Sequence, residues 1–239
     1  MSKDSRSHPK IRLFKTPAHN CSYIQDRQAS TIFVDPDLLL TKSINTELSG
    51  LGFRRSGSHL YRPDCDTCKA CISCRIPVKN FSIGSKHRRI IKRNQDLVVV
   101  KAKELTCDQS YGLYERYINA RHADGDMHPA TSDQFKAFIK TGTPDTYFYK
   151  FYVKDKLISV SVTDALENGL SAVYTFFEPR EKRRSLGIYS ILIQLQKCQE
   201  IGLPYLFLGY WIKNCQKMEY KADFRPIELL VEGRWLLAK

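Results

Sequence analysis

The chain of 239 residues is long enough to bury a sizeable core, and 42% of its residues are hydrophobic. No apolar run approaches the roughly 18 residues that a membrane span needs, and the first eight residues lack the apolar stretch of a secretory signal. We therefore expect a cytoplasmic protein, in which eight cysteines favour free thiols or metal ligands over disulfides.

The net charge of +13 lies almost wholly in the first part of the chain. Residues 1–105 carry 20 lysines and arginines against 9 acidic residues, whereas residues 106–239 carry 18 against 16. Between Arg75 and Arg93 there are seven basic residues and no acidic one. Such a run can be a solvated face, but the asymmetry favours a surface for nucleic-acid phosphates.

The first half reads as short elements separated by turns. Alternation, glycine positions and basic periodicity give its expected elements. In chain order they are a polar arm over 1–15, a strand over 31–34, a helix over 38–51, a hairpin over 53–62 with its bend at Gly57, a strand over 75–78, a basic helix over 86–94 and a strand from 96.

The second half has longer periodic segments. Thr131 and Gln134 form a capping box that opens a helix to about Lys140. The other expected elements are a helix from 108 or 110 to 121, a three-stranded meander over 147–153, 157–165 and 170–177, a helix over 188–202 and a buried strand over 206–212. This order is that of GNAT-type acyltransferases. We expect an α+β fold with two parts, a smaller basic, cysteine-containing module over 1–105 and a GNAT-like catalytic domain with a mixed sheet over 106–239.

Four thiols at two-residue gaps form the densest motif. They are Cys65, Cys68, Cys71 and Cys74, and Cys21 is a further thiol in the basic half. On a helix these thiols would fan over half the circumference, so they can converge only in a loop. The spacing is compatible with an iron–sulfur cluster, with zinc, with thiol redox chemistry or with plain thiols.

The loop before the 188–202 helix offers an anion site. Backbone N–H groups at the start of a helix attract anions, and GNAT enzymes hold the pyrophosphate of acyl-CoA there with a pattern that Arg184 and Gly187 match. Tyr189 replaces the third, small residue of that pattern and should crowd a pyrophosphate. The sequence therefore favours an acyl donor other than CoA.

The segment over 213–225 follows the last buried strand. Lys213, Lys217, Lys221 and Arg225 recur every four residues, which on a helix makes one cationic face. That face can be solvated, or it can form an anion site beside the cleft. No P-loop, dinucleotide fingerprint, zinc-protease motif or serine-hydrolase motif occurs, so the chemistry must use an already activated donor.

A set of motifs in order from Cys21 to Trp235 resembles one family. The motifs are CSYIQDRQA from Cys21, GFRRSG from Gly52, YRPDCDTCKAC from Tyr61, RNQDL from Arg93, RHADGDM from Arg121, VTD from Val162, SLGIY from Ser185, LGYWI from Leu208, CQKMEYK from Cys215 and GRW from Gly233. They resemble the bacterial aspartate/glutamate leucyltransferases, which are relatives of the arginyl-tRNA–protein transferases. Cys74 departs from the bacterial pattern.

The resemblance implies a cytoplasmic aminoacyltransferase of the N-degron pathway. It would move leucine from leucyl-tRNA to proteins that begin with Asp or Glu and so mark them for degradation. No cofactor is needed for that chemistry, although the cysteines can hold an iron–sulfur cluster or zinc. An arginyl donor, a noncatalytic RNA-binding module and a CoA-dependent acetyltransferase are the alternatives.

With this function, the candidate site residues fall into five groups. The backbone of Ser185, Leu186 and Gly187 would meet the acyl group or terminal ribose, and Tyr174, Tyr210 and Trp211 would shape the leucyl pocket. Lys217 and Lys221, together with Met218 and Tyr220, would bind the acidic side chain of the acceptor or tRNA. Arg75, Lys92 and Arg93 would contact tRNA phosphates, and the metal candidates are Cys21, Cys65, Cys68, Cys71 and Cys74.

Overall fold

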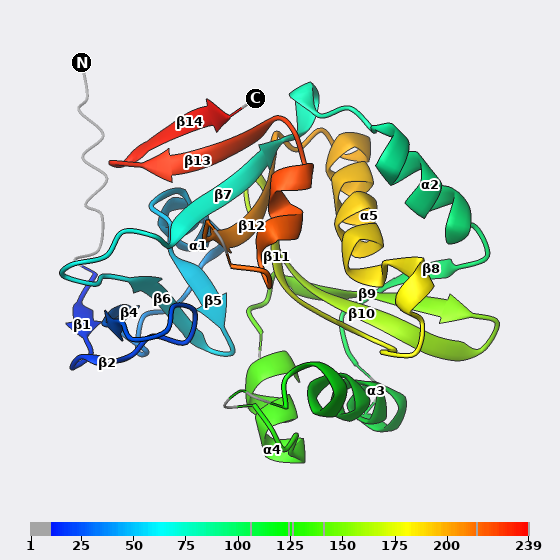
Figure 1. Ribbon diagram of the computed structural model, residues 1–239, viewed down its shortest axis with the longest axis horizontal. Helices are drawn as coiled ribbons and strands as arrows, with labels where there is room; N and C mark the ends of the chain where they lie inside the picture. The colour runs from blue at the N-terminus through cyan, green and yellow to red at the C-terminus, as the bar shows by residue number, and fades with distance from the viewer. Residues whose placement is uncertain are drawn as a thin grey trace.

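The centre of the molecule is one mixed sheet of eight strands, in the order β14-β13-β7-β12-β11-β10-β9-β8 (Figure 1). The computed structural model describes residues 11–105, 107–123, 125, 127–140, 142–213 and 215–238. The strands of this sheet are β7 (Ile72–Pro77), β8 (Val98–Ala102), β9 (Thr146–Val153), β10 (Lys156–Ala165), β11 (Gly169–Phe177), β12 (Tyr205–Trp211), β13 (Ile227–Val231) and β14 (Arg234–Ala238).

The predicted meander is confirmed as β9, β10 and β11, and β12 returns parallel to β11. The same sheet also contains two strands from the first 105 residues, the part of the chain that we expected to form a separate module. Strand β7 lies between β12 and β13, and β8 is the outer neighbour of β9. The α+β class is confirmed, while the division into a basic module and a catalytic domain stays a prediction.

Helices cover both faces of this sheet (Figure 1). On one face, α5 (Leu186–Glu200) and α2 (Ser85–Arg93) pack over a core that includes Phe151 and Leu206. On the other, α3 (Cys107–Arg121) and α4 (Ser132–Phe135) pack over Val160 and Phe176. Neighbouring residues of β9 and β10 thus point into different cores, which explains why both strands are apolar almost throughout.

A second sheet, in the order β1-β4-β6-β5, has its own small core. The helix α1 (Lys42–Gly50) packs there through Leu48, beside Phe53 and Leu60. The strands are β1 (Leu13–Lys15), β4 (Thr31–Val34), β5 (Arg54–Ser56) and β6 (His59–Pro63), and β2 (His19–Asn20) pairs separately with β3 (Gln28–Ala29). The predicted strand over 31–34 and hairpin over 53–62 are confirmed. Residues 1–10 of the predicted arm lie outside the described residues.

The predicted helices lie close to their expected positions. The helix α1 begins after Thr41, whose side chain caps it, rather than at Leu38. The capping box of Thr131 and Gln134 is present and opens α4, which continues as a π-helix, η2 (Lys136–Lys140). Of the helices in the described residues, none is both long and apolar enough to cross a membrane.

The predicted cationic helix over 213–225 is wrong. The described part of this segment contains one short 3-10 helix, η4 (Glu219–Asp223). Lys221 is only 6% exposed, whereas Lys213 and Lys217 are exposed. The four-residue spacing predicted one cationic helix face, either solvated or forming an anion site, but Lys221 is buried against β12. The β13–β14 hairpin that follows was not anticipated.

Candidate active site at the divergence of β11 and β12

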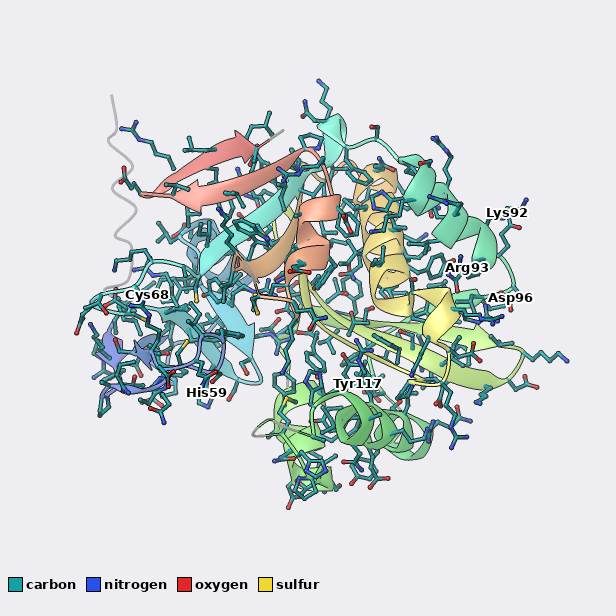
Figure 2. All side chains as sticks on the ribbon, viewed as in Figure 1. His59, Cys68, Lys92, Arg93, Asp96 and Tyr117 are labelled. Atoms are coloured by element: carbon teal, nitrogen blue, oxygen red, sulfur yellow. The ribbon has the colours of Figure 1, made fainter. Side chains whose placement is uncertain are left out.

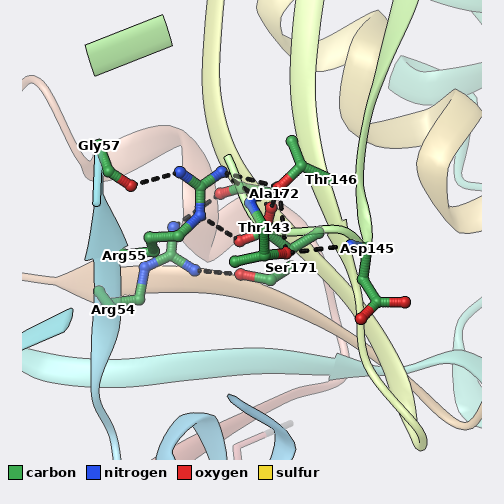
Figure 3. Close-up of polar contacts among 9 residues, drawn as sticks. Arg54, Arg55, Gly57, Thr143, Asp145, Thr146, Ser171 and Ala172 are labelled. Atoms are coloured by element: carbon green, nitrogen blue, oxygen red, sulfur yellow. Dashed lines mark hydrogen bonds and ion pairs between the residues drawn. The ribbon is translucent and has the colours of Figure 1, made fainter. Parts of the chain in front are cut away.

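The parallel strands β11 and β12 pair for three residues only, from Gly169 with Tyr205 to Ser171 with Phe207. Beyond that point the side chain of Arg54, from β5, lies between them. Its Nη1 donates to Ser171 Oγ at 3.0 Å and its Nη2 donates to the Ala172 carbonyl at 2.6 Å (Figure 3). The guanidinium therefore occupies the place where the next strand-to-strand contacts would lie.

Gly209 of β12 makes room for this guanidinium. Its φ of +78° belongs to the left-handed region, and a Cβ there would come within 2.6 Å of Arg54 Nε. The register of β12 against β7 also shifts between Phe207 and Gly209. The irregularity in β12 is thus coupled to the position of Arg54.

Lys221 brings a second cation to the same place. Its Nζ donates to the carbonyl of Tyr210, the residue after Gly209. Burial is the main reason why its pKa is lowered to about 8, and the positive charge of Arg54 lowers it further while Cys74 opposes the shift. Among the described residues, neither Arg54 nor Lys221 forms an ion pair with a carboxylate.

Arg55, the neighbour of Arg54, has the opposite environment. Its Nε and Nη2 donate to the two oxygens of Asp164 in β10, at 2.6 and 2.8 Å (Figure 3). The Thr146 hydroxyl donates to the same carboxylate at 2.6 Å, and Arg55 Nη1 donates to the Gly57 carbonyl. Both charged side chains are at most 2% exposed. This network joins the small sheet to the large one.

Aromatic side chains lie next to the divergence. Tyr174 of β11 packs against Phe138 and Tyr117, with ring centroids 5.0 and 6.3 Å away. Its hydroxyl is buried, and no described residue hydrogen-bonds to it. Burial raises its pKa. Tyr220 is 37% exposed as a whole residue, and the pKa of its phenol is also raised, chiefly by burial and further by Cys74 and Tyr117.

One of the predicted pocket residues, Tyr210, serves the fold instead. Tyr210 is 5% exposed, and its hydroxyl donates to the carbonyls of Gly52 and Tyr61 at 2.9 and 3.2 Å. The half-buried Trp211 packs against the core under α5. The leucyl-pocket role predicted for Tyr210 is therefore corrected, since its polar group is already satisfied by the backbone.

The helix α5 begins at Leu186, as the loop motif indicated. Ser185 is its N-cap in a left-handed conformation with φ of +53°, and its side chain makes no capping bond. Tyr189 is buried against Phe151, with ring centroids 5.8 Å apart. Its ring therefore lies in the core below the helix, so the expectation that Tyr189 crowds a pyrophosphate is not supported by its position.

Cations gather on the surface of α2. Lys92 and Arg93 are exposed, and the Arg93 guanidinium donates to the Arg183 carbonyl in η3 (Lys182–Arg184), the turn that precedes α5. Figure 2 places both side chains near Asp96, which forms a bidentate pair with Arg184 at 2.8 Å. The exposed cations of this surface, which we call the α2 surface, are Lys86, Arg88, Arg89, Lys92, Arg93, Lys182 and Arg183.

Arg75 is not part of the α2 surface. It lies in β7, is 9% exposed, and its Nε donates to Glu228 at 2.6 Å. Its guanidinium stacks on Tyr205 and Trp235, 3.6 and 4.2 Å from the ring centroids. The predicted contact of Arg75 with tRNA phosphates is corrected, because this side chain holds β7, β12 and the β13–β14 hairpin together.

The cysteines separate into two environments. Cys74 is 1% exposed in β7, and its thiol donates to the Gly209 carbonyl at 3.2 Å, so it is a core residue and not part of the predicted metal group. Burial raises the pKa of Cys71 to about 12, and the thiols around it, Cys21, Cys65, Cys68 and Cys215, raise it further. Figure 2 places Cys68 on the side of the molecule away from Lys92. Within the described ranges, no group of three or more Cys, His, Asp or Glu side chains is arranged to hold a metal ion.

Arg54 is the residue of this site that the sequence did not reveal. It stands in the motif GFRRSG, where two adjacent arginines look alike. Alternation along a strand predicts that they point to opposite faces. It does not predict that one meets Asp164 and the other meets no carboxylate.

The fold and the site define a mixed α+β protein with a buried lysine and a half-buried arginine at the divergence of two parallel strands and a basic surface along α2. Such an arrangement suits anionic substrates. The chain belongs to the arginine-tRNA–protein transferase family. The model of the family's N-terminal part matches residues 19–89, and that of its C-terminal part matches residues 109–231.

Curated relatives extend over almost the whole chain. An aspartate/glutamate leucyltransferase of Alcanivorax borkumensis is 53% identical over 94% of this chain and 93% of its own length. One from Pseudomonas fluorescens is 50% identical over 95% of this chain and 97% of its own. Among solved structures, L-PGS from Bacillus licheniformis is similar over 62% of this chain and 48% of its own, with 10% identity and a TM-score of 0.48. That last similarity is too low to inform function.

Proposed function

We propose that this protein transfers leucine from leucyl-tRNA to the α-amine of proteins that begin with Asp or Glu. The observation that carries the proposal is the near full-length identity of about half to the aspartate/glutamate leucyltransferases. The basic α2 surface supports a tRNA partner, and the recessed cations Arg54 and Lys221 support an acidic acceptor. The product would be a protein marked for degradation by the N-degron pathway, in the cytoplasm.

The reaction makes modest demands on the protein. The aminoacyl ester is already activated, and an N-terminal amine has a reference pKa of about 7.7–8.0, so a usable fraction is neutral at pH 7. Attack of the amine on the ester carbonyl forms the amide and releases the 3′ hydroxyl of the tRNA. Alignment of amine and ester can supply several kcal/mol of the rate enhancement. Hydrogen-bond donors to the developing oxyanion supply more.

The role of each part follows from its position. The backbone N–H groups at Leu186 and Gly187, at the start of α5, would face the ester or the terminal ribose. Tyr174, whose buried hydroxyl has no hydrogen-bond partner among the described residues, and Trp211 would border the leucyl group. Lys92 and Arg93 would bind tRNA phosphates. Lys217, Met218 and Tyr220 lie on the segment that carries Lys221 and would border the acceptor.

We assign the fold to the GNAT-like acyltransferases as part of this proposal. The order of β9, β10 and β11, followed by α5 and the parallel strand β12, supports it, as does the early divergence of β11 from β12. No step of the proposed reaction passes through a metal. Cys21, Cys65, Cys68 and Cys71 stay a predicted site for an iron–sulfur cluster or zinc, which metal analysis of anaerobically purified protein tests.

One experiment tests the function directly. Purified protein is incubated with tRNA charged with labelled leucine or labelled arginine, and with peptides that begin with Asp, Glu or Ala. We expect leucine to appear on the Asp and Glu peptides only. Label from arginyl-tRNA alone would assign the arginyl donor instead. Tight tRNA binding without label on any peptide would point to a noncatalytic RNA-binding module.

A further inference from the structure

Arg54 and Lys221 converge on one turn of β12. Arg54 Nε packs against Gly209, and Lys221 Nζ donates to the carbonyl of Tyr210, the next residue. The two cations are close enough for the charge of Arg54 to lower the pKa of Lys221, and the charges of both oppose the rise that burial causes in the pKa of Cys74. Two positive charges from distant parts of the chain, β5 and η4, therefore lie side by side at the divergence of β11 and β12.

This pair of cations lacks the counter-charge that its burial calls for. Lys221 is 6% exposed and Arg54 is half-buried, yet in the described part of the chain their hydrogen-bond partners are neutral: Ser171 Oγ and the carbonyls of Ala172 and Tyr210. A buried charge without a counter-ion is unfavourable unless a ligand supplies one. A guanidinium has five N–H donors, and the described residues use two of those of Arg54. Donors remain for an anion.

We infer that Arg54, together with Lys221, binds the side-chain carboxylate of the acceptor's first residue and is the residue that selects Asp or Glu. The inference deepens the proposed function and rests on it. Carboxylate oxygens match the planar donors of a guanidinium, and a carboxylate at the end of a short side chain can reach a recessed cation. The neutral main chain of the same residue would then place its α-amine beside the divergence of the two strands.

A phosphate of the tRNA fits this position less well. A phosphodiester carries a ribose on each side and needs an open surface, whereas Lys221 is almost fully covered. The exposed cations of the α2 surface already offer such an open place, and they lie on a different element. The recessed pair is therefore assigned to the small acidic group and the α2 surface to RNA.

The test measures acceptor selectivity in variants of Arg54. Leucine transfer at saturating leucyl-tRNA is compared for peptides that begin with Asp or Asn and with Glu or Gln, because the members of each pair have nearly the same shape and differ in charge. We expect Arg54→Met to lower kcat/KM for the Asp and Glu peptides by about 10- to 100-fold, the range for one charge-assisted hydrogen bond, with little change for Asn and Gln. Arg62→Met is the matched control, because Arg62 lies on the adjacent strand β6 and also donates to a backbone carbonyl.

Several outcomes would overturn the inference. A folded Arg54→Met that keeps the wild-type preference for Asp over Asn excludes Arg54 as the selecting residue. A rise in KM for leucyl-tRNA, with acceptor selectivity intact, assigns the cation to RNA. If Arg54→Met does not fold, thermal unfolding of the wild-type protein with an Asp-Ala or an Asn-Ala dipeptide decides: only the Asp dipeptide should raise the Tm, and equal shifts contradict the inference. A wild-type protein that labels no peptide at all would count against the proposed function itself.

Discussion

Arg54 and Arg55 are adjacent in β5, yet one is neutralised and the other is not (Figure 3). Arg55 meets both oxygens of Asp164, in a pair that is almost fully buried. Among the described residues, Arg54 donates to a hydroxyl and a carbonyl and to no carboxylate, and it lies beside a second cation, Lys221. Arg55 therefore holds the two sheets together, whereas Arg54 and Lys221 keep their charges available for a ligand.

The two environments should respond to mutation in opposite ways. Removing one member of a satisfied buried pair leaves the other charge uncompensated, which destabilises the fold. Removing one member of two like charges relieves repulsion and desolvation, which stabilises the fold but removes a binding group. Free energy of unfolding and catalytic activity therefore distinguish the two arginines.

The largest effect is expected for Asp164→Asn. This change leaves the buried Arg55 guanidinium without its counter-charge and should lower the free energy of unfolding by about 3–5 kcal/mol. Urea denaturation at pH 7 measures it. Asp66→Asn is the control, since Asp66 pairs with Lys15 on the surface and its loss should leave the midpoint almost unchanged. A similar small change for Asp164→Asn would contradict the assigned role of the Arg55 pair.

The opposite sign is expected for Lys221→Met. The pKa of Lys221 is about 8 in the folded protein and 10.5 when exposed, so at pH 7 the buried charge costs about 3 kcal/mol. Met removes that cost. The gain in the free energy of unfolding is reduced because the Tyr210 carbonyl loses its hydrogen bond from Lys221. The stability of the wild-type protein should approach that of Lys221→Met as the pH rises from 8 to 10.5. In this range the unfolded state binds more protons than the folded state, so a higher pH favours the folded state.

Urea denaturation of both proteins at pH 7 and pH 10 checks the sign. Lys217→Met is the control, because Lys217 is exposed on the same segment and should change stability by no more than about 0.5 kcal/mol. A stabilised Lys221→Met protein with reduced transfer to Asp peptides fits a binding group. A destabilised one with unchanged transfer would assign Lys221 to the fold.

The contrast between the cations also marks what the sequence could reveal. Periodicity predicted the meander, α5 and the capping box at Thr131, because those patterns depend on neighbouring residues. The pairing of β7 with β12 was not predictable in the same way, since it joins segments about 130 residues apart that no local pattern connects.

The segment over 213–225 shows the same limit at the site. A four-residue spacing of cations is typical of a helix face, but spacing carries no information about burial, and Lys221 is buried among core residues. The role of Arg54 could not be predicted from the sequence for a related reason. Its role depends on the carboxylate that Arg55 has and Arg54 lacks, and only tertiary packing brings Asp164 to one of the two.

The exposed cations of the α2 surface can be tested separately from Arg54 and Lys221. Lys92→Ala should weaken leucyl-tRNA binding and reduce the slope of log K against log salt by about 1, because one phosphate contact is lost. Acceptor selectivity should stay unchanged. Binding titrations at several salt concentrations measure the slope, with Lys42→Ala on α1 as the control for an exposed lysine elsewhere. An altered ratio of Asp to Asn transfer in Lys92→Ala would contradict the assignment of the α2 surface to tRNA alone.

The smallest effect concerns pH. Below a pKa of about 8 Lys221 is charged and adds to the attraction of Arg54, and above it only Arg54 remains. The ratio of kcat/KM for an Asp peptide to that for an Asn peptide should therefore fall above pH 8, by at most about tenfold per pH unit, toward a plateau. The thiols of Cys74 and Cys215 favour the charged form of Lys221 and already contribute to this pKa. Because kcat/KM reports the free enzyme, a bound carboxylate does not move the fall.

Using a ratio isolates Lys221 from the other titrations. The α-amines of the two peptides titrate in nearly the same range, and hydrolysis of the leucyl ester at alkaline pH affects both reactions equally. Lys221→Met is the control and should give a ratio that is already low and does not change between pH 7 and 9. A wild-type ratio that is flat over this range would mean that Arg54 selects the acidic residue alone, since a group that binds the carboxylate only when protonated must lose that contribution as it titrates.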